Sequence, residues 1–132
     1  MNRQNDQHGE LKFKELTAKI IGCSFEVSNE LGSGFLESVY EKALIIALSD
    51  AGISAESQQT IKVSFRSEIV GDFYADILVE GKVLIELKAV KNLIPEHEAQ
   101  TINYLNATGI EVGLLINFGN PKLEFKRFTR KH

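Results

Sequence analysis

The first third of the chain carries apolar residues at helical spacing. The stripe consists of Leu16, Ile20, Cys23, Val27 and Leu31. Recurrence at every third or fourth position predicts a helix over residues 10–31, and the glycines that follow it are suited to closing a helix. A second apolar stripe predicts a helix over residues 35–51. Residues 1–9 are polar and lack such a stripe, so we expect a disordered tail there.

The middle and end of the chain change to apolar runs of strand length. Alternation over residues 61–65 predicts a first strand, and two apolar runs joined by the turn 80–82 predict a hairpin. Residues 95–108 begin with a proline suited to a first helical turn and predict a third helix. The apolar residues in 112–118 and 123–128 predict two last strands. The order ααβββαββ indicates an α/β fold, with a mixed sheet flanked by helices.

The predicted hairpin carries charged residues on one of its faces. Pairing the strands through the turn makes the other face wholly apolar, with the pairs Val79–Val83, Ile77–Ile85, Ala75–Leu87 and Phe73–Ala89. The same register places Asp76 opposite Glu86 and Tyr74 opposite Lys88. Directly opposed residues have Cβ atoms roughly 4.5–5.5 Å apart. Two carboxylates that close repel each other unless a cation or a proton lies between them.

This charged face has two interpretations. Two carboxylates and a lysine suit a divalent metal beside an activated water, which is an arrangement for phosphodiester hydrolysis. The alternative is a set of solvated charges with an ordinary cross-strand ion pair. The face also carries Leu78, Leu84 and Val90, so it is at least partly covered, and half-buried charges need partners. The residues alone leave both interpretations open.

The composition bounds the class of protein. The 132 residues suit one domain, which we expect over residues 10–132. Hydrophobic residues make up 43% and charged residues 25% of the chain, as is usual for soluble globular proteins. No apolar run approaches the ~20 residues of a membrane span, and the N-terminus does not resemble a signal peptide, so we expect a cytoplasmic protein. Cys23 lies at an apolar helical position and is expected in the core.

The charge is uneven along the chain. The net charge of −3 argues mildly against an extended nucleic-acid surface. Residues 1–81 hold seven Lys and Arg against thirteen Asp and Glu, whereas residues 82–132 hold eight against five. The basic C-terminal run could contact phosphate. A solvated strand edge explains it equally well, and for that run alone we favour this explanation.

Polar side chains on two predicted helices are further candidates. Glu37 and Tyr40 share a face at the start of the second helix. Glu37 either caps this helix end or adds a third carboxylate to the metal site. His97, Gln100 and Tyr104 share a face of the third helix, which follows the hairpin after a short connection. That face either borders the acidic residues or faces solvent, and solvent is the commoner case.

Three short motifs occur in order along the chain. They are GxxExxY at residues 34–40, D…ExK at Asp76 and residues 86–88, and QxxxY at residues 100–104. Together with the apolar strand at residues 113–118, they resemble the bacterial GxxExxY protein family of the PD-(D/E)XK nuclease superfamily. The resemblance covers roughly residues 11–128. It implies a restriction-endonuclease-like fold with a nuclease-type site.

The resemblance also implies residue roles. Asp76 and Glu86 match the metal-binding acids, and a carbonyl of Leu87 is a candidate further ligand for Mg²⁺ or Mn²⁺, which prefer oxygen. Lys88 matches the motif lysine, which orients or activates water and offsets charge on the phosphorane. Glu37 matches the helix glutamate that often completes such a site.

The implied substrate side involves the helices. Gln100 and Tyr104 match the pair seen in RecB-type exonucleases, and Tyr40 and His97 are expected beside them. Ala75 stands where the superfamily name expects proline, which costs little because the aspartate performs the chemistry.

The leading hypothesis is therefore a Mg²⁺- or Mn²⁺-dependent nuclease that acts on DNA more readily than on RNA. One alternative is a non-catalytic nucleic-acid-binding, protein-binding or regulatory module on the same fold. Another is a hydrolase for a small phosphorylated molecule. A chain of this size has little room for a module that reads sequence, so a homo-oligomer or a partner would have to supply sequence specificity.

Overall fold

The computed structural model describes residues 13–130. Their elements are α2 (Lys14–Leu31), α3 (Glu37–Asp50), β1 (Ala55–Phe65), β2 (Glu68–Val79), β3 (Val83–Lys88), α4 (Pro95–Thr108), β4 (Val112–Asn117) and β5 (Glu124–Thr129). This order is the predicted ααβββαββ. The expected tail at residues 1–9 and the expected start of the first helix lie outside the described residues. Nowhere in residues 13–130 is a helix both long enough and apolar enough to cross a membrane.

The five strands form one mixed sheet in the order β1-β2-β3-β4-β5. β3 and β4 run parallel, and α4 connects them, while every other neighbouring pair is antiparallel. β4 is buried along its whole length. Burial on both faces explains why its sequence is a continuous apolar run and not an alternating one.

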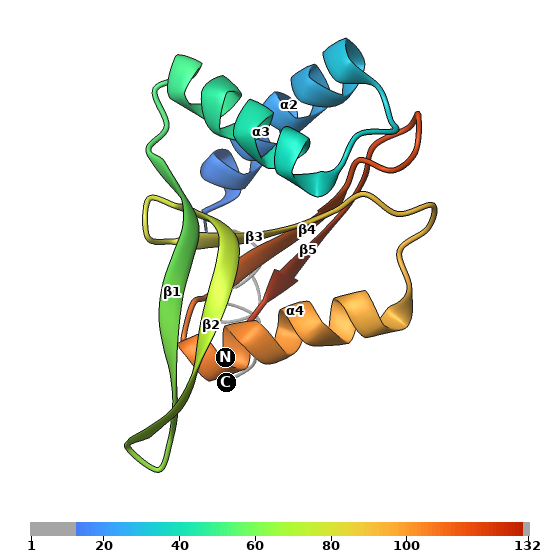
Figure 1. The fold of residues 1–132 in the computed structure, drawn as a ribbon. Coiled ribbons are helices and arrows are strands. Elements are labelled where there is room, and N and C mark those ends of the chain that lie inside the picture. The colour runs from blue at the N-terminus through green and yellow to red at the C-terminus, as the bar shows by residue number, and fades with distance from the viewer. Residues whose placement is uncertain (1–12, 131–132) are drawn as a thin grey trace, which may run out of the picture.

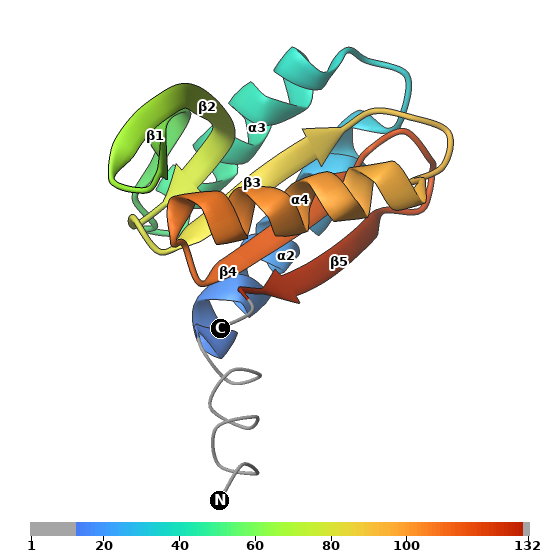
Figure 2. The ribbon, with the colours of Figure 1, turned by 90° about the horizontal axis from the view of Figure 1, so that it is seen from below.

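Helices cover both faces of this sheet (Figures 1 and 2). α2 and α3 lie together on one face, above the larger apolar cluster, which includes Ile20, Leu44, Leu48, Ile85 and Leu114. α4 lies on the opposite face, above a smaller cluster of Phe73, Ala75, Leu84 and Leu105. Cys23 is buried in the larger cluster, as expected.

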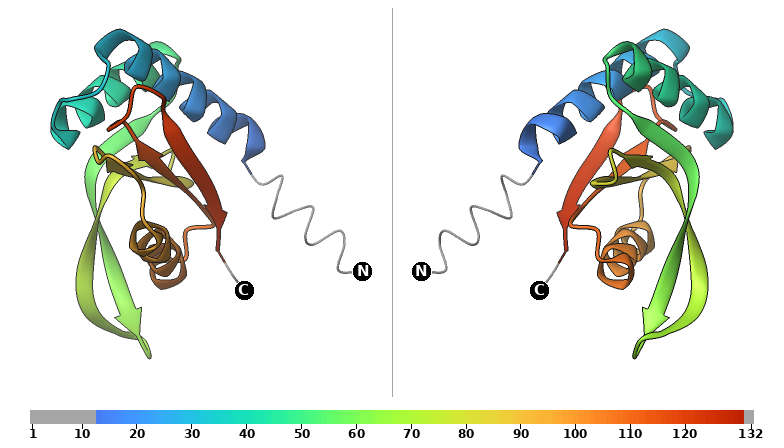
Figure 3. Two further views of the ribbon diagram at one scale, coloured as in Figure 1. Left: turned by 90° about the vertical axis from the view of Figure 1, so that its right-hand side faces the viewer. Right: turned by 90° about the vertical axis from the view of Figure 1, so that its left-hand side faces the viewer.

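β1 is longer than its apolar pattern predicts. The alternation marks residues 61–65, but the strand begins at Ala55 and includes the polar residues 56–60. β1 is an edge strand, and its pairing with β2 along this length defines it more than an apolar face does. Together, β1 and the first half of β2 form an arm that extends past α4 (Figures 1 and 3).

β2 separates from β3 at Asp76. The ladder between them has the predicted register from Val79–Val83 to Ile77–Ile85 and ends there. The predicted pairs of Ala75 and Phe73 with β3 are wrong, because both residues join the cluster on the α4 face. Ile77 and Val79 join the cluster on the opposite face. Alternate residues of a regular strand share one face, so β2 twists sharply between Ala75 and Ile77.

The neighbouring strand is distorted at the same level. Gln58 of β1 stands opposite Asp76 in register but is missing from the β1–β2 ladder. Its φ of 55° lies in the left-handed region, which is uncommon for a residue other than glycine. The departure of β2 from the sheet therefore involves β1 as well.

Candidate active site

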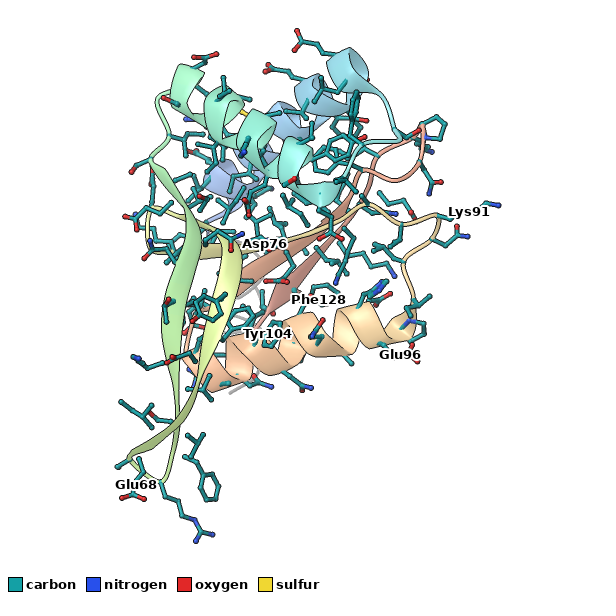
Figure 4. All side chains as sticks on the ribbon, in the orientation of Figure 1. Glu68, Asp76, Lys91, Glu96, Tyr104 and Phe128 are labelled. Atoms are coloured by element: carbon teal, nitrogen blue, oxygen red, sulfur yellow. The ribbon has the colours of Figure 1, made fainter. Side chains whose placement is uncertain are left out.

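A pocket of about 400 Å³ opens where β2 leaves β3. It is lined by Glu37, Asp72, Phe73, Tyr74, Asp76, Glu86, Leu87, Lys88, Gln100 and Tyr104. α3, β2, β3 and α4 all contribute to its walls. Figure 4 shows Asp76 on β2 at a level between α3 and α4, with Tyr104 on α4 beside the same strand.

Side chains replace the main-chain ladder at the point of separation. Oδ2 of Asp76 accepts the backbone N–H of Leu87 at 2.8 Å. The carboxylate of Glu86 lies close enough to the backbone N–H of Asp76 for that group to lower its pKa. The side chain of Asp76 therefore links β2 to β3 where the ladder ends, and the two carboxylates lie close together there.

The pocket disfavours the ionised form of Glu86. Its side chain is buried, with 8% of the residue exposed, and its Oε1 has no hydrogen-bond partner. Burial raises the pKa of Glu86 to about 8, and the nearby charge of Asp76 adds to the shift. Burial also raises the pKa of Asp76, against the opposing effects of the Leu87 N–H and Lys88. A buried carboxylate with a free oxygen requires a proton or a cation.

Lys88 lies on the same face of β3 as Glu86 and is half-buried. Its positive charge lowers the pKa of both Asp76 and Glu86, although burial outweighs this effect for each carboxyl. One lysine does not neutralise two carboxylates. The site therefore retains an attraction for a further positive charge.

α4 contributes Gln100 and Tyr104 to the opposite wall. The Tyr104 ring stacks on Phe73 with centroids 3.6 Å apart, and Gln100 lies beside its hydroxyl and lowers its pKa. Burial and then the charge of Glu86 raise the pKa of Tyr104. His97 does not line this pocket, contrary to expectation. Its Nδ1 accepts the backbone N–H of Ile94 at 3.2 Å, so His97 caps the start of α4.

Glu37 reaches the pocket from the start of α3. It is the first residue of the helix, Leu36 is the N-cap, and no side chain caps this end. Glu37 therefore does not cap this helix end through a side-chain hydrogen bond. Within residues 13–130, no three His, Cys, Asp or Glu side chains form a group that could hold a metal ion. Glu37 thus lines the pocket as an exposed residue without joining Asp76 and Glu86 in a tight three-carboxylate cluster.

Tyr40 is a core residue and not part of the pocket wall. It is fully buried, and its ring stacks on Phe118 with centroids 4.7 Å apart and planes 7° apart. Its hydroxyl donates to the carbonyl of Gly32 at 2.6 Å and accepts the N–H of Phe35 at 3.2 Å. Both hydroxyl interactions fix the loop between α2 and α3. Tyr40 therefore does not line the pocket where it was expected, because its polar atom is already engaged inside the protein.

The sequence did not single out several residues around the pocket. Asp72 and Phe73 belong to the arm and become neighbours of the site only because β2 twists. A smaller cavity of about 120 Å³ adjoins the pocket and is lined by Glu37, Ser38, Glu41, Gln58, Asp76 and Leu87. Gln58 Nε2 donates to Glu41 there at 2.8 Å. Neither Gln58 nor Glu41 belongs to a recognisable motif, so no sequence signal marks them.

A larger hollow of about 590 Å³ lies elsewhere, beside the start of α2. Its charged residues include Glu80 and Lys82, whose side chains approach to 4.0 Å and are both well exposed. It contains no buried carboxylate. The smaller pocket at Asp76 and Glu86 is therefore the better candidate for chemistry, because there a buried carboxylate oxygen, Oε1 of Glu86, has no hydrogen-bond partner.

Comparison with known proteins gives a consistent result. The family model described as "PD-(D/E)XK nuclease superfamily" matches residues 14–128. No curated protein matches the chain.

Solved structures with low sequence identity share the fold. The crystal structure of SSO0001 aligns with a TM-score of 0.55 and 17% identity, over 73% of this chain and 51% of that one. An alkaline exonuclease, LHK-Exo from Laribacter hongkongensis, aligns with a TM-score of 0.52 and 16% identity, over 71% and 55% of the two chains. LHK-Exo in complex with dAMP aligns with a TM-score of 0.50 and 13% identity, over 82% and 76%. The chain spans about half the length of the first two structures.

Proposed function

The chain belongs to the PD-(D/E)XK nuclease superfamily, and we propose that it is a Mg²⁺- or Mn²⁺-dependent nuclease that hydrolyses phosphodiester bonds in DNA. The observation that carries this proposal is the buried, unpartnered Oε1 of Glu86 beside Asp76. Carboxylate oxygens are the ligands that these ions prefer, and Mg²⁺ commonly binds through one or two carboxylates while it keeps several waters. Two adjacent acids therefore fit such an ion without a third close carboxylate.

The residues around the two acids have matching roles in this proposal. Asp76 and Glu86 hold the ion, and the backbone carbonyl of Leu87 is a candidate ligand because the Leu87 N–H already faces Asp76. Glu37 would act from the rim, where it lines the pocket as an exposed residue. When bound, the metal polarises the phosphate and lowers the pKa of a coordinated water.

Lys88, Gln100 and Tyr104 act on the substrate. The ammonium group of Lys88 orients the attacking water and offsets charge on the phosphate oxygens. Gln100 and Tyr104 donate hydrogen bonds to a phosphate or a base edge from the opposite wall. DNA is favoured as the substrate because a neighbouring structure, LHK-Exo, is described as bound to dAMP, a deoxynucleotide.

An assay on the purified chain tests this proposal. Labelled single- and double-stranded DNA and RNA of one sequence are incubated with Mg²⁺, with Mn²⁺ or with a chelator, beside Glu86→Gln. The matched control is Glu68→Gln, which changes an exposed carboxylate at the far end of the same hairpin. We expect wild type and the control to cleave DNA only when metal is present, and Glu86→Gln to be inactive.

Three outcomes contradict the proposal. Equal cleavage by wild type and Glu86→Gln would assign the activity to something other than this site. Binding of nucleic acid without cleavage under any metal would favour the non-catalytic module. If only a small phosphorylated compound is hydrolysed, the fold is used for a different substrate class.

A further inference from the structure

Asn117 ends β4 as a fully buried polar residue. Its Oδ1 accepts the N–H groups of Val90 at 2.9 Å and Gly119 at 3.0 Å. Its Nδ2 donates to the carbonyl of Val90 at 2.8 Å and to Oε1 of Glu124 at 2.8 Å. A side-chain amide offers two donors and two acceptor positions, so every hydrogen-bonding position of Asn117 is filled.

These bonds extend the sheet beyond the last residue of β3. Lys88 pairs with Asn117 in the parallel β3–β4 ladder, and the Phe118 N–H donates to the Lys88 carbonyl at 2.8 Å. β3 ends at Lys88, yet the amide of Asn117 binds both the N–H and the C=O of Val90, two residues further on. The side chain therefore takes the place of the next main-chain partner.

The backbone of Lys88 is consequently anchored on both sides. Before it, the Leu87 N–H is bound to Asp76 Oδ2 at 2.8 Å. After it, the Val90 backbone is bound at two points to Asn117. Gly119 allows this close approach, because a Cβ at that position would lie 1.9 Å from the carbonyl oxygen of Val90. A lysine side chain is long and flexible, so the position of its ammonium group depends strongly on the backbone from which it starts.

We propose that Asn117 is a positioning residue for Lys88, and that it holds the ammonium group at the attacking water and phosphate. This inference rests on the proposed nuclease function. Asn117 itself does not touch the substrate, because it is fully buried and has no donor or acceptor left. Its influence on the reaction passes through the segment 88–90, which its amide holds.

A double-mutant cycle tests this dependence. In a wild-type background, Asn117→Ala should lower kcat for DNA cleavage by roughly 10- to 100-fold, which is the scale of a misplacement of about 1 Å. Affinity for Mn²⁺, measured by calorimetry, should stay within about twofold because Asp76 and Glu86 are held by other bonds. In a Lys88→Ala background, the same substitution should change kcat by no more than about twofold. A general structural role would lower kcat equally in both backgrounds and would overturn the proposal.

Two further variants keep the test valid if Asn117→Ala folds poorly. Glu124→Ala removes the partner of one amide N–H and leaves the bonds to Val90 in place, so it should give a smaller loss of kcat that also vanishes with Lys88→Ala. Asn29→Ala changes an exposed asparagine on α2 and should leave kcat unchanged. A loss of kcat for Glu124→Ala that persists in the Lys88→Ala background contradicts the proposal.

A structural measurement separates this inference from the proposed function. Crystal structures of wild type and Glu124→Ala or Asn117→Ala report the position of Lys88 Nζ without any assay of activity. We expect Nζ to point toward Asp76 and Glu86 in wild type and to be displaced in the variants. If wild type cleaves nothing but Nζ is displaced, the proposed function fails and the positioning role stands. If Nζ stays in place in Asn117→Ala, the positioning role fails whatever the activity.

Discussion

The two halves of β2 differ in their neighbours. Residues 77–79 are paired on both sides, with β1 and β3, and the side chains of Ile77 and Val79 enter the core beneath α2 and α3. Residues 68–75 pair with β1 alone, and Phe73 and Ala75 pack toward α4. Asp76 stands at the boundary, where it bonds to β3 through its side chain. The pocket therefore forms where β2 separates from β3, and Asp76 is the acidic residue at that point.

Two acids at this boundary should account for the metal affinity. We expect Asp76→Asn or Glu86→Gln to weaken Mn²⁺ binding by at least about 100-fold, because loss of a ligand costs more than loss of a group that only orients one. Titration calorimetry measures the affinity. The control is Glu68→Gln, in the half of β2 that pairs with β1 alone. An unchanged dissociation constant for either variant would remove the boundary from the metal site.

Stability of the metal-free protein should depend on pH through Glu86. Its pKa of about 8 in the folded chain exceeds the ordinary value of 4.5, so the folded state holds a proton that the unfolded state releases. The free energy of unfolding should therefore fall as pH rises from 4.5 to 8, by up to about 1.4 kcal/mol per pH unit. Denaturant unfolding in chelator measures this slope.

Glu86→Gln provides the control for the pH measurement. It keeps the size of the side chain and removes the ionisable group, so the slope should flatten. Saturating Mn²⁺ should also raise stability most at high pH, because binding requires the ionised carboxylate. The same slope in wild type and Glu86→Gln would mean that another group causes it.

The half of β2 that pairs with β1 alone, residues 68–75, should affect substrate binding and not metal binding. Tyr104 packs on Phe73 of this half, and its hydroxyl lies in the field of Glu86. Tyr104→Phe keeps the ring and removes one hydrogen bond to substrate, so we expect roughly 2- to 10-fold weaker DNA binding. Mn²⁺ affinity should stay within about twofold. A larger effect on metal than on DNA would place Tyr104 with the ligands.

The smallest effect is expected for Glu37. It lines the pocket from the first turn of α3 but forms no tight cluster with the two acids. Glu37→Gln should weaken Mn²⁺ binding by about threefold, and it should lower stability by less than about 1 kcal/mol through the lost interaction with the helix end. Calorimetry and thermal unfolding measure the two quantities. Unaltered metal affinity with a clear loss of stability would assign Glu37 to the helix end alone.

The salt dependence of DNA binding tests which lysines outside the pocket contact phosphate. The pocket wall holds four acidic residues and one lysine, so phosphate attraction must come from outside it. Lys91 lies in the connection before α4 (Figure 4) and is exposed, whereas Lys126 is paired with Glu98 at 2.6 Å. Lys91→Ala should therefore reduce the salt slope of DNA binding by about one, and Lys126→Ala by less. Equal slopes in all three proteins would exclude phosphate contact by Lys91.

Much of the fold follows from local patterns in the sequence. The apolar periods give the order of elements, and the apolar face of the hairpin gives the register from Val79–Val83 to Ile77–Ile85 correctly. The acids and the lysine lie on one face because side chains alternate along a strand. The QxxxY residues reach the pocket because their spacing puts both on one helical face.

Predictions from local patterns failed for residues that have a competing interaction partner elsewhere in the fold. Tyr40 and Glu37 share a helix face by spacing, yet Tyr40 is drawn into the core by Phe118 and the loop at Gly32. His97 has the spacing of a pocket residue, but an unpaired backbone N–H at the helix start binds its ring. In the sequence, Asn117 lies at the end of an apolar strand. Nothing there shows that its amide forms hydrogen bonds with the backbone of Val90.

Local patterns in the sequence are enough to predict the elements, the sheet register near the turn, and the set of acidic and basic groups available for chemistry. These depend on interactions between residues close together in the chain. Three features appear only in the folded chain: β2 leaves β3 at Asp76, Phe73 packs against Tyr104, and Oε1 of Glu86 is buried without a hydrogen-bond partner. Those features depend on strand twist and on packing between segments far apart in sequence, and no local pattern encodes either of them.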